Sequence, residues 1–362
     1  MDQNSNGDDR QACCCEKAGE KSPAGMINRI EIVVGEIPQA STKLTLGDKI
    51  GSWKARWGIN RMNYKINPGL YCVGDADNTS PVLVTANYKM SFDRLRKELS
   101  GINAWILVLD TKGINVWCAA GKGTFGTDEL VSKILMTNLS KIVSHKTLIL
   151  PQLGAPGISA HEVQKRSGFK VVFGPVRASD LKDFLKAGMK ATSEMRQVKF
   201  TLYDRLVLTP IELVGTLKVS LMIFGVLFIL NLFNANFFGL VDFYGYIGAL
   251  LIGCVLVPLL LPWIPGNAFA WKGWLMGMLW AIGINVINGW PFYPEYGLVR
   301  ALAYMLILPP ISAFYAMNFT GASTYTSLSG VLKEMKTAVP AIIISTTLGG
   351  ILIIMSSLIS SI

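Results

Sequence analysis

Histidine is scarce in this chain of 362 residues, and its six cysteines are not paired in the way that metal clusters require. No Cys-x-x-Cys pair is present, which argues against an internal iron–sulfur cluster or a structural zinc site. The cysteine spacing is not that of a secreted disulfide framework either. The two histidines, His145 and His161, are expected at the surface or at helix ends.

A secretory signal peptide is also missing from the first residues, which are polar and acidic, so the N-terminal half is expected in the cytoplasm. Residues 1–26 have no hydrophobic periodicity and are predicted to form a disordered tail. The tail contains Cys13, Cys14 and Cys15. Adjacent thiols can capture a soft ion such as Hg(II), although an incidental exposed run explains them equally well.

Charged residues become rare after Pro210, where only five of the 34 Lys and Arg and four of the 24 Asp and Glu are found. Five apolar segments follow, each about 20 residues long, as a bilayer core requires. They are residues 211–232, 244–263, 268–288, 297–317 and 338–359. The sequence therefore predicts an all-α transmembrane domain of five helices over residues 206–362.

The basic residues indicate how this domain is oriented. Arg196, Lys199 and Arg205 precede the first span, and Lys333 and Lys336 precede the last. Because basic residues favour the cytoplasmic side, residues 27–205 are expected in the cytoplasm and the C-terminus outside the cell membrane. The part before Pro210 carries 29 basic and 20 acidic residues, and this positive charge favours anionic lipid headgroups or an acidic partner. No nucleic-acid-binding module is recognisable, so no nucleic acid is expected as a partner.

Residues 27–187 alternate between strand and helix patterns. Strands are expected at 26–34, 81–85, 104–110, 147–150 and 169–173, and helices at 91–99, 127–144, 159–167 and 179–187. Such alternation predicts a Rossmann-like α/β domain over 27–205, with a mostly parallel sheet and helices on both faces. Ligands in such folds bind at the carboxyl ends of the strands.

The most informative segment follows the apolar strand at 104–110. Asn115 is a good N-cap residue and is expected to begin a short helical turn, which places Cys118 near the third helical position. The free backbone N–H groups and the dipole of a helix N-terminus favour an anion there, such as a thiolate. Lys122 adds positive charge one turn later. The arrangement suits a thiolate that binds a metal or attacks an electrophile, although a buried structural cysteine is the alternative.

The segment Asn115-Val116-Trp117-Cys118-Ala119-Ala120-Gly121-Lys122 resembles the cap-helix motif of the mercury-methylating corrinoid proteins of anaerobic microbes. The resemblance implies that these eight residues bind a corrinoid of the cobalamin type. It further implies that Cys118 is the lower axial ligand of the cobalt. Many cobalamin methyl carriers supply a histidine from an Asp-x-His-x-x-Gly motif, but neither histidine of this chain lies in that context, which favours Cys118 as the ligand.

The same resemblance implies a reaction and a partner. The expected activity is corrinoid-dependent transfer of a methyl group to inorganic Hg(II), giving methylmercury. The expected partner is a ferredoxin-like protein with two four-iron clusters (4Fe–4S), and the expected location is the cell membrane.

Two other functions remain open from the sequence. One is a membrane-bound corrinoid methyl carrier of one-carbon metabolism. The other is a membrane transporter with a nucleotide-binding regulatory domain. The G-x-G-x-x-G match at 121–126 is only weak support for a dinucleotide site, because about ten residues separate it from the preceding strand and no Asp or Glu ends the next strand.

Overall fold

The computed structural model describes residues 26–32, 35–232, 238–291 and 297–360. The chain forms two compact units. One consists of Met1–Lys49 and Lys65–Lys190, and the other of Ile50–Tyr64 and Ala191–Ile362. The tail cysteines Cys13, Cys14 and Cys15 lie outside the described residues.

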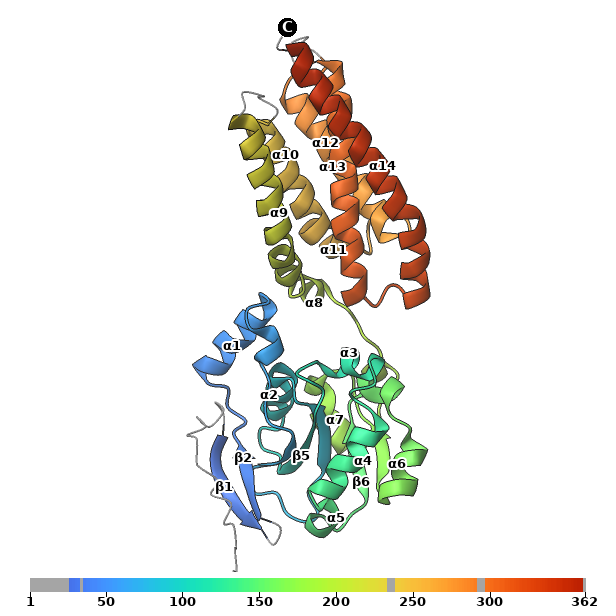
Figure 1. Cartoon of the computed structure of the whole chain (residues 1–362). Coiled ribbons are helices and arrows are strands. Elements are labelled where there is room, and N and C mark those ends of the chain that lie inside the picture. The colour runs from blue at the N-terminus through green and yellow to red at the C-terminus, as the bar shows by residue number, and fades with distance from the viewer. Residues whose placement is uncertain (1–25, 33–34, 233–237, 292–296, 361–362) are drawn as a thin grey trace, which may run out of the picture. The chain divides into compact units, whose positions relative to one another are not determined.

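The first unit is built on a seven-stranded mixed sheet (Figure 1). The strands, in sheet order, are β1 (Met26–Ile32), β2 (Gly35–Ala40), β3 (Gly69–Val73), β5 (Ala104–Leu109), β4 (Val82–Ala86), β6 (Thr147–Leu150) and β7 (Lys170–Phe173). Strands β5, β4, β6 and β7 are parallel, as are β2 and β3, whereas β1 with β2 and β3 with β5 are antiparallel.

Four of the six neighbouring strand pairs in the described sheet are parallel, so the sheet is mostly parallel as predicted, but the antiparallel pairs of β1 with β2 and β3 with β5 were not expected. Strands β2 and β3 were not expected from the sequence. Only two residues separate β1 from β2 in the chain, which is a hairpin spacing and too short for the crossover that a parallel pair needs.

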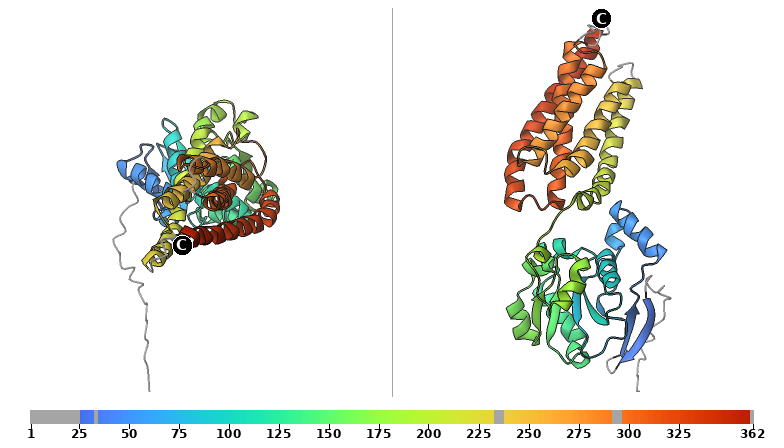
Figure 2. Two further views of the ribbon diagram at one scale, coloured as in Figure 1. Left: turned by 90° about the horizontal axis from the view of Figure 1, so that it is seen from above. Right: turned by 180° about the vertical axis from the view of Figure 1, so that it is seen from behind.

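Helices cover both faces of the sheet, as expected. The helices of this unit that follow β4 are α2 (Lys89–Glu98), α3 (Val116–Gly121), α4 (Thr127–Met136), α5 (Leu139–Ile142), α6 (Ala160–Ser167) and α7 (Leu181–Lys186). Figures 1 and 2 show α4 and α6 on one face and α2 and α7 on the other. The predicted helix 127–144 is wrong in one respect: Asn138 adopts a left-handed conformation (φ 47°) and divides it into α4 and α5.

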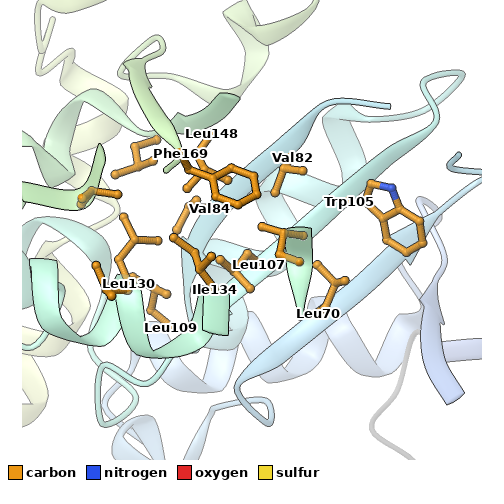
Figure 3. Close-up of a cluster of buried hydrophobic side chains, with 14 of the residues drawn as sticks. Leu70, Val82, Val84, Trp105, Leu107, Leu109, Leu130, Ile134, Leu148 and Phe169 are labelled. Atoms are coloured by element: carbon orange, nitrogen blue, oxygen red, sulfur yellow. The ribbon is translucent and has the colours of Figure 1, made fainter. Parts of the chain in front are cut away.

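The core of the first unit lies between the sheet and α4 (Figure 3). Leu107 and Leu109 of β5 are fully buried beside Leu130 and Ile134 of α4. All six residues of β5 are buried, because helices cover the strand on both sides. The carboxyl end of β5 is thus fixed firmly, and the segment that follows it begins from a rigid position.

The second unit is helical. Its elements are α8 (Leu202–Leu206), α9 (Thr209–Leu232), α10 (Leu240–Leu251), η5 (Ile252–Leu256), α11 (Val257–Leu260), α12 (Phe269–Ile287), α13 (Leu298–Asn318) and α14 (Leu328–Ser360). The segment η5 is a π-helical turn just before Pro258. A proline ring clashes with the carbonyl four residues earlier in an α-helix, and the wider turn accommodates it.

Helices occupy all five segments expected to span a membrane, but four are long and apolar enough to do so among the described residues. These are Leu202–Ile229, Leu240–Leu260, Leu298–Gly321 and Ser329–Ser356. The expected span 268–288 forms helix α12, but its mean hydropathy is too low for it to count among these four. It contains Lys272 and Asn285 together with three tryptophans, which lower its hydropathy.

Glycines of two helices lie closely against α13. A Cβ atom on Gly273 of α12 would lie 2.5 Å from the carbonyl oxygen of Ser312, and one on Gly253 of η5 would lie 2.6 Å from the same oxygen. A Cβ atom on Gly277, one turn after Gly273, would lie 2.7 Å from the Cα atom of Pro309. This i, i+4 glycine pair is the pattern that lets helix backbones pack in membranes.

Candidate functional site

The candidate site begins with the loop that leaves β5, and a buried side chain from the neighbouring strand fixes it. Asn87 directly follows β4, and its Oδ1 accepts hydrogen bonds from the backbone N–H groups of Thr111 (3.1 Å) and Gly113 (3.0 Å). Gly113 has φ 75°, a conformation that favours glycine. Because β4 and β5 pair in parallel, their carboxyl ends meet and bring Asn87 to this loop.

Asp110 holds the first turn of the same loop. Its carboxylate accepts hydrogen bonds from the backbone N–H of Lys112 (3.0 Å) and from the Lys112 ammonium (2.9 Å). Burial alone would raise the pKa of Asp110, but the bonds from Lys112 outweigh it and lower the pKa. The backbone N–H of Asp110 donates to Glu129 of α4 (2.8 Å), so the loop is also tied to the helix layer.

The short helix α3 then begins as the sequence predicts. Asn115 is its N-cap residue, and the Asn115 Oδ1 accepts a hydrogen bond from the backbone N–H of Cys118 (2.9 Å). Cys118 is therefore the third residue of the helix. Its thiol is exposed, which contradicts the alternative of a buried structural cysteine. Trp117 beside it is 40% exposed.

The opposite side of α3 is buried and packs on η2 (Gln152–Gly157), the segment after β6. Val116, Ala119 and Ala120 form this side. A Cβ atom on Gly157 would collide with the Phe125 carbonyl oxygen and lie 3.1 Å from the Cα atom of Ala120. Residues predicted together from one motif thus divide in two: Val116, Ala119 and Ala120 anchor the helix, and the others face outward.

The outward side carries the groups that can meet a ligand. Gly121 and Lys122 are exposed and close the helix, and nothing lies within 4 Å of a Cβ placed on Gly121. One atom of the supporting segment has an unusual state: the side-chain oxygen Oε1 of Gln152 is buried and has no hydrogen-bond partner. Buried polar atoms are nearly always paired, so this oxygen is a candidate acceptor for a bound group.

The histidines are not part of this site. The His145 Nε2 lies 2.9 Å from the Ser80 carbonyl oxygen, and its Nδ1 accepts the backbone N–H of Thr147 (3.3 Å), so both ring nitrogens are occupied. His161 is exposed at the start of α6. The described residues contain no group of three or more His, Cys, Asp and Glu able to hold a metal ion.

Sequence reasoning missed Asn87, Asp110, Glu129 and Gln152. Three of them could have been predicted from their position in the sequence. Asn87, Asp110 and Gln152 each lie within two residues of the end of an apolar strand, and such folds bind ligands at that edge of the sheet. Glu129 could not have been predicted in this way, because its contact with Asp110 depends on how α4 packs on the sheet.

The fold and the site define an α/β domain that presents one exposed thiol on a capped helical turn beyond a strand end. Residues 60–185 match the protein family described as the CO dehydrogenase/acetyl-CoA synthase delta subunit. The match includes the whole candidate site and ends before the helical unit's long helices.

Individual proteins with similar sequences match about a third of the chain. The acetyl-CoA decarbonylase/synthase complex subunit gamma of Methanopyrus kandleri is 32% identical over 124 residues, which are 34% of this chain and 26% of that protein. The corrinoid/iron-sulfur protein large subunit of Moorella thermoacetica is 26% identical over 131 residues, or 36% of this chain and 28% of that protein. The chain thus spans about a quarter of the length of the curated relatives it matches.

Proposed function

We propose that the α/β domain binds a corrinoid and takes part in methyl transfer. The observation that carries this proposal is the exposed thiol of Cys118 on a capped helical turn, inside residues 60–185, which match the CO dehydrogenase/acetyl-CoA synthase delta subunit family. The similarity to a corrinoid/iron-sulfur protein supports it. The relatives named for acetyl-CoA synthesis support the same general chemistry. The proposal concerns this domain, because the family match ends at residue 185, before the long helices of the helical unit.

The residues present fit such a group. A thiolate is a soft ligand suited to cobalt. Trp117 offers an exposed aromatic face next to the thiol, and the Gln152 Oε1 offers an unpaired acceptor to the amide side chains of a corrin. Asn115, Gly121 and Lys122 would border the group, whereas Val116, Ala119 and Ala120 would hold the helix that carries it.

The corrinoid, when bound, supplies the transferable methyl group. The chain's own contribution begins with Cys118, whose Sγ would bind the cobalt. A thiolate donates more charge than an imidazole, and it would therefore ease departure of a methyl group with its bonding electrons. The hydrogen bonds of Asn87 and Asn115 keep the loop and the helical turn in place. The Cys118 side chain is therefore already positioned before the reaction begins.

Inorganic Hg(II) is the acceptor that we propose. The support is the uninterrupted match of residues 115–122 to the motif of the mercury-methylating proteins. Hg(II) is a soft electrophile, so it must receive the methyl group with its bonding electrons. Cys13, Cys14 and Cys15 would capture the ion. A ferredoxin-like partner with two 4Fe–4S clusters would supply the electrons that return the cobalt to its reduced state.

The second candidate is a corrinoid methyl carrier of one-carbon metabolism. The relatives' names favour it, because several are subunits of an acetyl-CoA decarbonylase/synthase complex. The two candidates share corrinoid binding and differ in the acceptor. A methyl carrier would react with Hg(II) no faster than free methylcobalamin does.

We further propose that the helical unit lies in the cell membrane with the α/β domain in the cytoplasm. Four long apolar helices support a membrane location. We include α12 as a fifth crossing, because it has 19 residues and about 1.5 Å of rise per residue, and because its glycines pack closely on α13.

Anaerobic loading of the full-length protein with methylcobalamin tests the proposal. The absorption spectrum is expected to change on binding for the native chain and for Cys72→Ala, which removes a buried thiol near the opposite end of β5. Cys118→Ala should lose this change. Methylmercury formation from the loaded protein is then compared with free methylcobalamin at the same concentration. An unchanged spectrum contradicts corrinoid binding, and a changed spectrum without faster methylmercury formation favours the one-carbon carrier.

A further inference from the structure

The segment Ile50–Tyr64 belongs to the helical unit although it lies far from the rest of that unit in the sequence. It comprises most of α1 (Leu46–Arg56), a turn, and η1 (Arg61–Asn63). The turn ends α1 with two backbone hydrogen bonds, from Gly58 to the Ala55 carbonyl (3.2 Å) and from Ile59 to the Lys54 carbonyl (2.9 Å). Gly58 has φ 75°, so the helix ends in a Schellman motif and the chain folds back.

This segment is fixed beside the beginning of α9. A Cβ atom on Gly58 would lie 3.8 Å from Cγ1 of Ile211 and 3.9 Å from Cγ1 of Val214. Both residues belong to the first turns of α9, within the candidate span Leu202–Ile229. The segment is therefore located at the end of the first apolar helix, where that helix would leave a bilayer.

The exposed surface of the segment is apolar. Ile50, Trp53, Ile59 and Met62 are each more than half exposed. Ile50, Trp53 and Trp57 follow the spacing i, i+3, i+7, so they share one face of the helix, and the two tryptophan rings lie 5.7 Å apart. The opposite face is buried: Ala55 is fully covered, and Gly51 lies against the ring of Tyr64. The apolar stripe is thus directed away from the protein.

Basic residues border this stripe and no acidic residue does. Residues 49–65 contain five basic and no acidic side chains. They are Lys49, Lys54, Arg56, Arg61 and Lys65. A helix with tryptophan and aliphatic residues on one side and Lys and Arg along its borders has the composition of a helix that lies in a membrane interface. Tryptophan in particular is enriched at the level of the headgroups.

We propose that Ile50–Tyr64 is an interfacial membrane anchor, with its apolar stripe inserted among anionic phospholipid headgroups. Three observations select the lipid surface as the occupant: the contact with the start of α9, the basic borders, and the paired tryptophans. The anchor does not depend on the bound cofactor or on the reaction proposed above. It does depend on the helical unit spanning a bilayer.

Spin labels on the full-length protein test the anchor. The protein is reconstituted into vesicles of phosphatidylcholine and phosphatidylglycerol, with Cys13, Cys14, Cys15 and Cys118 changed to serine and a single label at Trp53→Cys or Ile59→Cys. Collisions of the label with oxygen, which concentrates in lipid, are compared with collisions with a water-soluble nickel chelate. At both positions we expect the label to collide more often with oxygen than with the nickel chelate.

Two label positions provide matched controls. Ile343→Cys lies on an exposed part of α14 and should report lipid, whereas Leu135→Cys is as exposed on α4 of the α/β domain and should report water. A lipid signal at 343 with water signals at 53 and 59 overturns the anchor while leaving the membrane location intact. A water signal at 343 as well contradicts the membrane location itself.

Charge and self-association give two further outcomes. Changing Lys49, Lys54, Arg56 and Arg61 together to glutamine should shift the labels at 53 and 59 toward water in these vesicles, because the attraction to anionic headgroups is lost. An unchanged signal contradicts the role of anionic lipid. Dipolar broadening between labels at 53, with neither reagent gaining access, would mean that a second copy of the chain covers the stripe, and it overturns the proposal.

Discussion

Single side chains decide how the exposed thiol is presented. The Asn115 Oδ1 satisfies the backbone N–H of Cys118, so Asn115→Ala should destabilise the helical turn by about 0.5–2 kcal/mol. We expect faster loss of corrinoid from the variant in gel filtration, with the thiol still reactive toward a maleimide. Asn115→Asp keeps a capping oxygen and is the control. Equal retention by the Ala variant and the native chain would contradict the capped geometry.

Asn87 makes a second prediction at this scale. It is buried, and Asn87→Ala would leave the backbone N–H groups of Thr111 and Gly113 without their acceptor. An unsatisfied buried donor costs about 1–3 kcal/mol, so the loop from Asp110 to Asn115 should open more often. Hydrogen exchange of the full-length protein should show faster exchange in that loop.

Asn103→Ala is the matched control for Asn87. Asn103 is exposed near the other end of β5 and accepts one hydrogen bond, from the backbone N–H of Asp75 (3.1 Å). Its replacement should leave exchange in the loop after β5 unchanged. If both variants behave alike, Asn87 has no special role at the site.

At the scale of elements, a buried ion cluster attaches the first turn of α1 to α2. Asp48 binds Lys89 (2.6 Å) and Arg96 (2.7 Å), and Asp93 binds the same two cations. Asp48→Asn would leave these buried cations with one carboxylate, and breaking such a pair costs about 3–5 kcal/mol. Trypsin should cleave after Lys43 or Lys49 faster in this variant. Asp75→Asn changes an exposed carboxylate and should have no such effect.

The same cluster predicts a pH dependence. Burial alone would raise the pKa of Asp48, but hydrogen bonds from Lys89 and Thr45 lower it from 3.8 to about 2. A carboxyl whose pKa is lower in the folded state stabilises that state above its ordinary pKa and loses this effect as the pH falls through the folded value. Attachment of α1 should therefore weaken between pH about 4 and about 2. Pepsin cleavage near residue 46 should rise over this interval in the native chain and stay flat in Asp48→Asn.

Elements also show what the sequence could predict. The strands at 82–86, 104–109 and 147–150 were predicted from the sequence. They are buried on both faces, so nearly every position is apolar and each strand appears as a continuous apolar run. Strand β2 contains Pro38 and polar residues, and α1 has its apolar stripe exposed, so neither follows the usual rule of an apolar face toward the core. Both were missed.

The candidate site divides in the same way. Asn115 and Cys118 are three residues apart, so their hydrogen bond follows from local sequence alone. Asn87 and Thr111 are 24 residues apart and meet only because β4 and β5 pair in parallel. Contacts that depend on strand pairing cannot be deduced from spacing, and this is why the supporting side chains were absent from the prediction.

At the scale of the whole molecule, the number of crossings fixes the side of the membrane on which the chain ends. If α12 crosses together with the four more apolar helices, the C-terminus lies opposite the α/β domain. If α12 does not cross, both lie on the same side. A cysteine added after Ile362 should react with an impermeant maleimide from outside intact cells, whereas Met136→Cys on α4 should not. Labelling of the C-terminal cysteine only after lysis would contradict five crossings.

The tail gives a second prediction at this scale. If Cys13, Cys14 and Cys15 deliver Hg(II), deleting residues 1–25 should slow methylation at low Hg(II) and have little effect at high Hg(II), because adjacent thiols bind a soft ion better than one. Changing the three cysteines to serine should reproduce the effect without shortening the chain. Equal rates for all three proteins over the whole Hg(II) range, with the ferredoxin-like partner present, would show that the tail takes no part.

The glycines of α12 have a consequence for how the protein is made. Helix α12 contains Lys272, Asn285 and three tryptophans. Its transfer into lipid as a single helix is therefore the least favourable among the five apolar helices. Gly273 and Gly277 fit only against Ser312 and Pro309 of α13, which is synthesised later. If α12 crosses the bilayer as proposed, we expect it to enter together with α13, as a helical hairpin, only after α13 has been synthesised. Ribosome-bound chains ending before α13 would then leave α12 accessible to water, and chains ending after it would not.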